Sequence, residues 1–220
     1  MRMFQTALMA GLLMFGLALG VAAPARAQDA AATLEQLAQQ AEEAYNRGDH
    51  AEAAALFTRA CDGGYALACA NLGVLHTQGR GVTQDLARAA AFYTRACDGG
   101  FAQACSNLGE LHNQGRGVTQ DHARAAALFT RACDGGYAGA CNNLGTLHDQ
   151  GRGVTQDHAR AAALYTRACD AGHARACYNL GLLHRQGRGV AQDDARAEQL
   201  FRRALELDPS LTAAREGSTR

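Results

Sequence analysis

The sequence contains no lysine and no tryptophan, and only three serines and two prolines among its 220 residues. Every basic side chain is therefore an arginine. The arginines are spread along the chain without forming a basic stripe, so the charge pattern does not indicate a nucleic-acid partner. No P-loop, Ser/His/Asp arrangement or paired-carboxylate motif stands out. We therefore predict no catalytic residue and no cofactor from these motifs.

The N-terminus has the features of a secretory signal peptide. Arg2 precedes an apolar run from Ala7 to Ala23, and the small-residue site Ala25-Arg26-Ala27 follows directly. We predict a signal peptide over residues 1–27, cleaved after Ala27, and a secreted or periplasmic mature chain without a membrane span. The alternative is a retained membrane anchor, because the run approaches spanning length. Cleavage would remove two arginines and no acidic residue, which takes the formal net charge from 0 to −2.

A repeat of 36 residues organises the remaining chain. The letters NLG and QGRGV recur at this interval, and all eight cysteines fall on it in two series. A fixed period of this length is typical of a solenoid, in which stacked units bury a continuous core that no single unit could bury alone. The two cysteine series are Cys61, Cys97, Cys133, Cys169 and Cys69, Cys105, Cys141, Cys177.

Each repeat is predicted to form two helices, because apolar residues recur at helical spacing on either side of the helix-breaking GRGV. In the first 36-residue copy we expect helices over about 66–78 and 85–98, with Gly79 as a left-handed C-cap and Asp85 as an N-cap. An earlier pair over 33–46 and 50–62 makes five helical hairpins. The predicted fold is an all-α superhelical solenoid over residues 28–209, followed by a C-terminal tail over 210–220. The last helix is the most charged, as suits the end of a stack.

The stretch NLGVLHTQGRGVTQDLARAAAFYTRACDGG resembles the Sel-one-like repeat, and LEQLAQQAEEAYNRGDHAEAAALFTRAC resembles the related tetratricopeptide repeat. Together the resemblance covers about residues 33–209. The added C-x7-C of each repeat resembles the secreted Helicobacter cysteine-rich protein family, whose solenoids carry one disulfide per repeat. Some relatives carry penicillin-binding and β-lactamase assignments, so the resemblance implies β-lactam hydrolysis as an alternative function. The serine motifs S-x-x-K, S-D-N and K-T-G are impossible here, because lysine is absent and the serines are Ser106, Ser210 and Ser218.

The cysteines allow two pairings that suit a two-helix repeat. Pairing within hairpins, as in Cys69 to Cys97, would leave Cys61 and Cys177 without partners, whereas pairing between adjacent hairpins uses all eight. A disulfide framework is favoured by the even count and the predicted secretion. The C-x7-C spacing is also not that of a zinc knuckle, and the redox motif CxxC is absent. The predicted bonds are Cys61–Cys69, Cys97–Cys105, Cys133–Cys141 and Cys169–Cys177.

Four histidines also repeat with the period: His76, His112, His148 and His184. Successive hairpins stack about 8–10 Å apart, whereas zinc ligands lie about 2 Å from the ion, so one metal could not gather these histidines. We predict no metal site. We expect these side chains to be buried and hydrogen-bonded to a neighbouring loop, and the other histidines, His50, His122, His158 and His173, to be exposed.

Comparison of the repeats with one another separates constant from variable positions. The first helix varies most at positions 67, 70, 74 and 77 and their equivalents, which share one helix face opposite Leu72 and His76. The resemblance to tetratricopeptide solenoids implies that this face lines a concave groove. The constant amides beside it are Asn71, Asn107, Asn143, Asn179 and Gln78, Gln114, Gln150, Gln186.

We therefore predict a scaffold that binds a peptide or protein segment in this groove. The constant asparagines would hydrogen-bond the partner's backbone, because an amide both donates and accepts. Variable neighbours such as Glu110, Arg175, Tyr178 and Arg185 would set sequence preference. Two alternatives stay open beside the hydrolase. The asparagines could bond only to adjacent turns, and the protein could be a structural spacer of the envelope.

Overall fold

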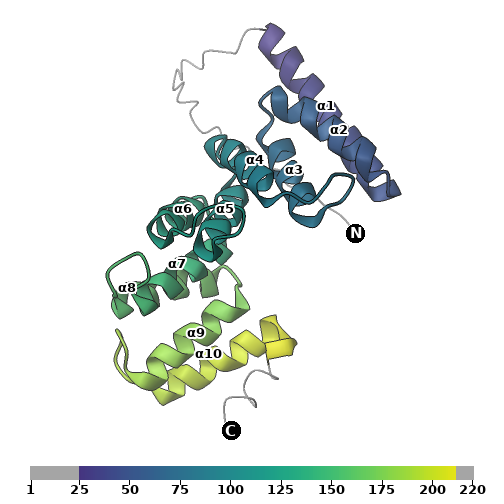
Figure 1. Ribbon diagram of the computed structural model, residues 1–220. Coiled ribbons are helices and arrows are strands. Elements are labelled where there is room, and N and C mark those ends of the chain that lie inside the picture. The colour runs from purple at the N-terminus through teal and green to yellow at the C-terminus, as the bar shows by residue number, and fades with distance from the viewer. Residues whose placement is uncertain (1–24, 212–220) are drawn as a thin grey trace, which may run out of the picture.

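Residues 25–211, which the computed structural model describes, form ten α-helices, one short 3-10 helix and no strand (Figure 1). The odd-numbered helices, called A helices, pair with the following even-numbered B helices to form five antiparallel hairpins. Figure 1 shows the hairpins stacked one after another in an elongated, curved array, with the first and last hairpins at opposite ends. The bounds are α1 Ala25–Arg47, α2 His50–Asp62, α3 Ala66–Gln78, α4 Leu86–Asp98, α5 Ala102–Gln114, α6 His122–Asp134, α7 Ala138–Gln150, α8 His158–Asp170, α9 Ala174–Gln186, α10 Asp194–Leu207 and the 3-10 helix η1 Pro209–Leu211.

The predicted helices are confirmed, with one difference at the N-terminus. Helix α3 has the predicted bounds, and α4 starts one residue after the expected N-cap Asp85. Helix α1 begins at Ala25 rather than near residue 33, because the intervening residues are mostly alanine and contain no helix breaker. Of the predicted signal peptide, residues 1–24 lie outside the described part, as do residues 212–220 of the predicted tail.

Both predicted caps are present. The Asp85 carboxylate accepts a hydrogen bond from the backbone N–H of Arg88 at 2.9 Å, and Asp121, Asp157 and Asp193 repeat this bond in later hairpins. Gly79 ends α3 in the left-handed conformation, with φ +69°. Together these caps fix the length of the loop that joins each A helix to its B helix.

The core is built mainly from alanine, leucine and cystine, with one large aromatic ring from each B helix. In the last four hairpins these rings sit against the glycine of NLG in the paired A helix. A Cβ added at Gly109 would lie 2.8 Å from the Phe129 ring, closer than side chains normally approach. The glycine therefore allows the two helices of a hairpin to pack closely around the ring.

The four disulfides join adjacent hairpins as predicted, each linking the end of a B helix to the start of the next A helix. The alternative pairing of Cys69 with Cys97 is wrong. The sulfurs are buried, with Cys61 fully enclosed and Cys69 2% exposed. Because disulfides are rare in the cytosol, the four bonds indicate an extracytoplasmic protein.

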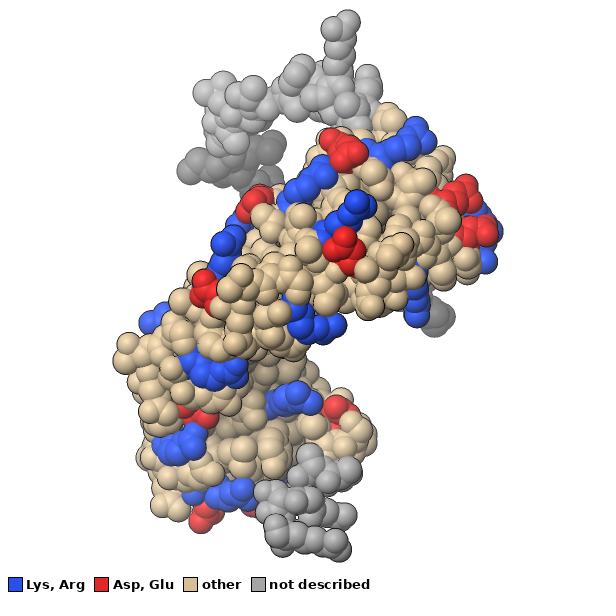
Figure 2. All heavy atoms as spheres, viewed as in Figure 1, with Lys and Arg blue, Asp and Glu red and all other residues tan. Residues whose placement is uncertain are grey.

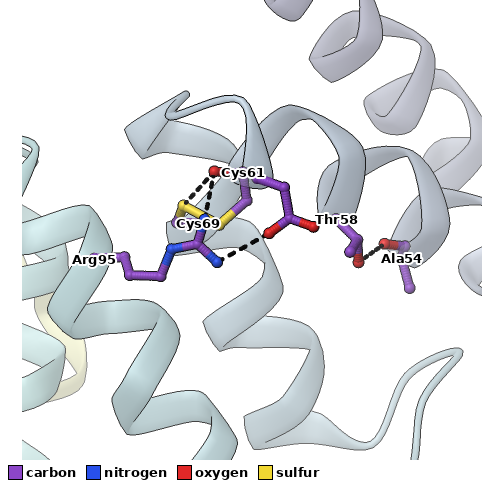
Figure 3. Close-up of a disulfide and its surroundings, with 6 residues drawn as sticks. Ala54, Thr58, Cys61, Cys69 and Arg95 are labelled. Carbon is purple, nitrogen blue, oxygen red and sulfur yellow. Dashed lines mark hydrogen bonds and ion pairs between the residues drawn. A yellow bond between two sulfur atoms is a disulfide. The ribbon is translucent and has the colours of Figure 1, made fainter.

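An arginine reinforces each of these junctions, and Figure 3 shows the first of them. Arg95 of α4 donates to the carbonyl oxygen of Cys61 at 2.7 Å and forms an ion pair with Asp62 at 3.1 Å. This carbonyl lies in the last turn of α2, where a cation also complements the helix dipole. Arg131, Arg167 and Arg203 make the same bond to Cys97, Cys133 and Cys169, and we call the four contacts the Arg clasps.

The GRGV loop makes a third contact between repeats. Gly81 has φ +67°, and a Cβ added there would lie 2.1 Å from the carbonyl oxygen of His50 at the start of the preceding B helix. Only glycine fits this position, because both the backbone conformation and the close approach exclude a side chain. Disulfide, Arg clasp and loop together fix each hairpin against the one before it.

Candidate binding groove

Two cavities open between consecutive A helices, on the surface that we call the A-helix face. The first, of about 310 Å³, lies between α1 and α3, and Phe57 of α2 forms part of its wall with Tyr45, Asn71 and Val74. The second, of about 360 Å³, is lined mainly by residues of α5, α7 and α9, together with Phe129 of α6 and Tyr165 of α8. Phe57 and Phe129 are two repeats apart, so the cavities occupy equivalent places in the array.

The second cavity brings together five of the residues predicted to bind a partner: Glu110, Asn143, Gln150, Arg175 and Asn179. Asn71 lines the first cavity instead. Other predicted residues do not line either cavity. Gln78, Gln114 and Gln186 are exposed at the ends of their A helices. Tyr178 and Arg185 pack on the Phe201 ring, with the Tyr178 ring centre at 5.2 Å and the guanidinium carbon at 5.2 Å from it.

A chain of amide groups crosses the second cavity from α9 to α7. Asn179 donates from Nδ2 to Oδ1 of Asn142 at 3.0 Å, and Asn142 donates from Nδ2 to Oδ1 of Asn143 at 3.3 Å. One N–H pair on Asn143 and one carbonyl oxygen on Asn179 therefore remain available to a partner.

Part of the predicted variable face is buried, which corrects the helical-wheel prediction that it lies wholly opposite the core. Ala70, Ser106 and Asn142 are only 4–5% exposed. The bond from Asn179 to Asn142 gives the reason, because at this position an A helix meets the next A helix in the array. A wheel drawn for one helix cannot show this contact. Sequence reasoning therefore treated Asn142 as a variable surface residue and missed its place in the amide chain.

Tyrosine hydroxyls reach the same face in the second and fourth hairpins. The Tyr93 hydroxyl lies 3.3 Å from the Thr77 hydroxyl and also shares a hydrogen bond with Asn107, and the Tyr165 hydroxyl lies 3.2 Å from that of Thr146. Burial raises the pKa of both tyrosines above the ordinary value of 10, so both are neutral donors and acceptors near neutral pH. Asn107 therefore lies beside the Tyr93 hydroxyl.

The charges around the second cavity differ in how well they are paired. Asp149 pairs with His158 at 2.8 Å and with Arg188 from the next repeat. Arg152 contacts two side-chain amide oxygens and a ring nitrogen of His122, all at 3.4 Å. Arg175 makes no hydrogen bond or ion pair within residues 25–211. Glu110 accepts a hydrogen bond from Gln114.

The repeating histidines are buried at three of the four places, as predicted. His76, His112 and His148 are 6%, 8% and 9% exposed, and His184 is half-buried. The predicted bond to a loop is present at His112, whose Nδ1 lies 3.3 Å from the carbonyl oxygen of Thr119. At the other three, Nδ1 has no partner within the described residues.

The histidines predicted to be exposed are partly buried, and that prediction is wrong for His50, His122, His158 and His173. His122 and His158 start B helices and bond back to the end of the paired A helix, at Asn113 and Asp149. His173 caps α9 by accepting from the backbone N–H of Ala176 at 3.3 Å, and burial, aided by Arg175, lowers its pKa below the ordinary 6.5.

Neither serine in the described range is placed as an activated nucleophile. Ser106 is 5% exposed inside α5, and the Ser210 hydroxyl donates to Asp208 at 2.7 Å. Residues 25–211 also hold no group of three or more His, Cys, Asp or Glu side chains arranged to bind a metal ion. Among the same residues, no helix is both long and apolar enough to cross a membrane.

Among solved structures, a protective antigen of uropathogenic Escherichia coli strains that displays an SLR fold is 33% identical, with a TM-score of 0.72. The match covers 79% of this chain and 40% of the antigen, so this chain spans well under half of that protein. A Sel1 repeat protein from Oxalobacter formigenes is 28% identical, with a TM-score of 0.72 over 77% of this chain and 70% of its own. Helicobacter pylori cysteine rich protein B is 22% identical, with a TM-score of 0.46 over 63% of this chain and 92% of its own.

No curated protein matches the sequence. The family model of the Sel1 repeat matches five consecutive segments, at residues 38–65, 66–101, 102–137, 138–173 and 174–209. These segments account for most of the chain and correspond to the five hairpins, so the protein belongs to the Sel1 repeat family.

Proposed function

We propose that this protein is a secreted or periplasmic scaffold that binds an extended peptide or protein segment across its A helices. The observation that carries this proposal is the amide chain of the second cavity. Its two ends leave one donor on Asn143 and one acceptor on Asn179, which is the pair that a peptide backbone complements. The cavity is otherwise lined mainly by polar groups, as suits a partner bound through its backbone.

The surface charge also favours a protein partner over a nucleic acid. Figure 2 shows arginine and acidic side chains interspersed over the visible face. The formal net charge of the whole chain is zero. Nucleic-acid affinity depends chiefly on neutralising phosphates with a concentrated positive surface, which this arrangement does not supply.

Replacement of Asn143 by aspartate tests the proposal. The aspartate keeps the Oδ1 that accepts from Asn142 but replaces the available N–H pair by a second acceptor, so the fold is retained while donation to a partner is lost. The matched control is Gln199→Glu, which makes the same amide-to-acid change at an exposed position of the B helix α10 and keeps the oxygen that accepts from Arg196.

The assay is crosslinking in the cell envelope from a photoreactive residue at position 146, followed by identification of the captured protein. We expect one specific partner with the wild type and the control, its loss with Asn143→Asp, and equal melting temperatures for all three proteins. Capture that is unaffected by Asn143→Asp would contradict the proposal, as would capture lost together with thermal stability.

A further inference from the structure

The large B-helix aromatics alternate along the array. They are Phe57, Tyr93, Phe129, Tyr165 and Phe201. At Tyr93 and Tyr165 the extra hydroxyl reaches the A-helix face and contacts a threonine there. At Phe57 and Phe129 the ring ends without a hydroxyl; Phe57 lines the first cavity, and Phe129 lines the second together with Tyr165.

The two cavities differ in chemistry. The apolar part of the first cavity's wall is formed by Phe57, Val74 and Leu75, and Glu42, Tyr45, Asn46 and Asn71 complete the lining. This wall favours an aliphatic or aromatic side chain, whose burial would remove apolar surface from water.

The second cavity presents more unpaired positive than negative charge. Within the described residues Arg152 and Arg175 form no ion pair, although Arg175 interacts at longer range with Asp208, whereas Asp149 is already paired by His158 and Arg188. Glu110 lies on the α5 side and already accepts from Gln114. A carboxylate entering beside α7 and α9 would meet two guanidinium groups and the available donor of Asn143.

We propose that the bound segment is held at two anchors, an apolar side chain in the first cavity and an acidic side chain in the second. This inference rests on the proposed function and adds the partner's chemistry and spacing. The first anchor lies between α1 and α3 and the second between α7 and α9, so the anchors are separated by three steps between A helices, or about 24–30 Å at ordinary packing distances. An extended chain covers about 3.3 Å per residue, so the two side chains lie about seven to nine residues apart.

A set of synthetic 14-residue peptides tests the spacing. Each carries one leucine and one glutamate in an otherwise Gly/Ser/Ala sequence, with separations of two to ten residues and in both orders, because the chain direction of the partner is open. Binding to the full-length protein is measured by fluorescence anisotropy. We expect affinity to peak at seven to nine residues in one order, at least tenfold above a separation of two.

The alternation itself supplies mild variants. Phe57→Tyr and Phe129→Tyr place in each cavity the hydroxyl that this chain already tolerates at equivalent positions, and Phe201→Tyr is the control outside both cavities. We expect each of the first two to lower affinity for the optimal peptide at least fivefold and the control to leave it unchanged. Arg152→Gln combined with Arg175→Gln should abolish the preference for glutamate over glutamine in the peptide.

The outcomes separate the two proposals. Binding that is independent of spacing, or unaffected by both cavity variants, but lost with Asn143→Asp would overturn the two-anchor model and leave the groove standing. Retained preference for glutamate in the double arginine variant would overturn the acidic anchor. Failure of every peptide to bind, together with capture in the envelope that depends on Asn143, would also refute the anchors alone.

Discussion

Removal of one junction disulfide from the middle of the array should cost a measurable and calculable amount of stability. We consider Cys133 and Cys141 replaced together by alanine. The bond joins residues eight positions apart and closes a loop of nine residues. In the chain-entropy model such a loop restricts the unfolded chain by roughly 8.7 cal/mol/K, or about 2.5 kcal/mol at 25 °C. For a chain of this size, that corresponds to a fall in melting temperature of about 5–10 °C.

The assay is thermal unfolding followed by circular dichroism, with and without reductant. In oxidising buffer we expect the double alanine variant to melt about 5–10 °C below the wild type. With reductant the wild type loses its own bonds, so the gap should shrink to the small contribution of packing by the two buried sulfurs. A gap of the same size under both conditions would refute the reasoning, because the stabilisation would then come from packing and not from the cross-link.

Three further predictions concern single positions. Gly109→Ala should destabilise the protein by about 1–3 kcal/mol in urea unfolding, because its Cβ would press on the Phe129 ring. Adding Phe129→Leu to this variant should recover part of the lost stability. If the destabilisations of the two single substitutions simply add in the double variant, the steric explanation is refuted. Since the folded-state pKa of His173 is lowered, the unfolded chain binds more protons below pH 6.5, so stability should fall as the pH drops from 6.5 towards 5. In His173→Gln the stability should depend less on pH over this range. If the stability of the wild type and of the variant falls equally with pH, the histidine is not the source of the dependence. Arg131→Gln should cost about 1–2 kcal/mol, mainly through the lost charged bond to the Cys97 carbonyl, because the accompanying ion pair is exposed and contributes little. Unchanged unfolding in urea would show that this Arg clasp does not stabilise the junction.

Most of the fold could be predicted from the sequence because the same helix-forming and capping residues recur in each repeat. The caps Asp85 and Gly79 and the helices between them depend only on neighbours in the chain. The disulfides followed from a counting argument at the ends of the array, which the geometry then bore out.

The candidate site was less predictable because it depends on contacts between repeats. Asn142 varies between copies, and nothing in the helix that carries it shows that the next A helix covers it. Partial burial of His122 and His158 has a different origin within the hairpin, since both bond to variable residues of the paired A helix. The alternation of phenylalanine and tyrosine, as at Phe57 and Tyr93, can be read from the sequence. Only the structure shows that the tyrosine hydroxyl reaches the A-helix face.

The short disulfide loops also bear on how the correct bonds are selected during oxidation. Eight cysteines can pair in 105 ways. Every native bond joins cysteines eight positions apart, whereas the next shortest separation, from Cys69 to Cys97, is 28 positions. Closing the longer loop costs about 1 kcal/mol more in chain entropy, which favours each native bond about fivefold before any helix has packed. The oxidised connectivity of this chain is therefore encoded largely by proximity along the polypeptide, and each bond can form as soon as its own nine residues are available.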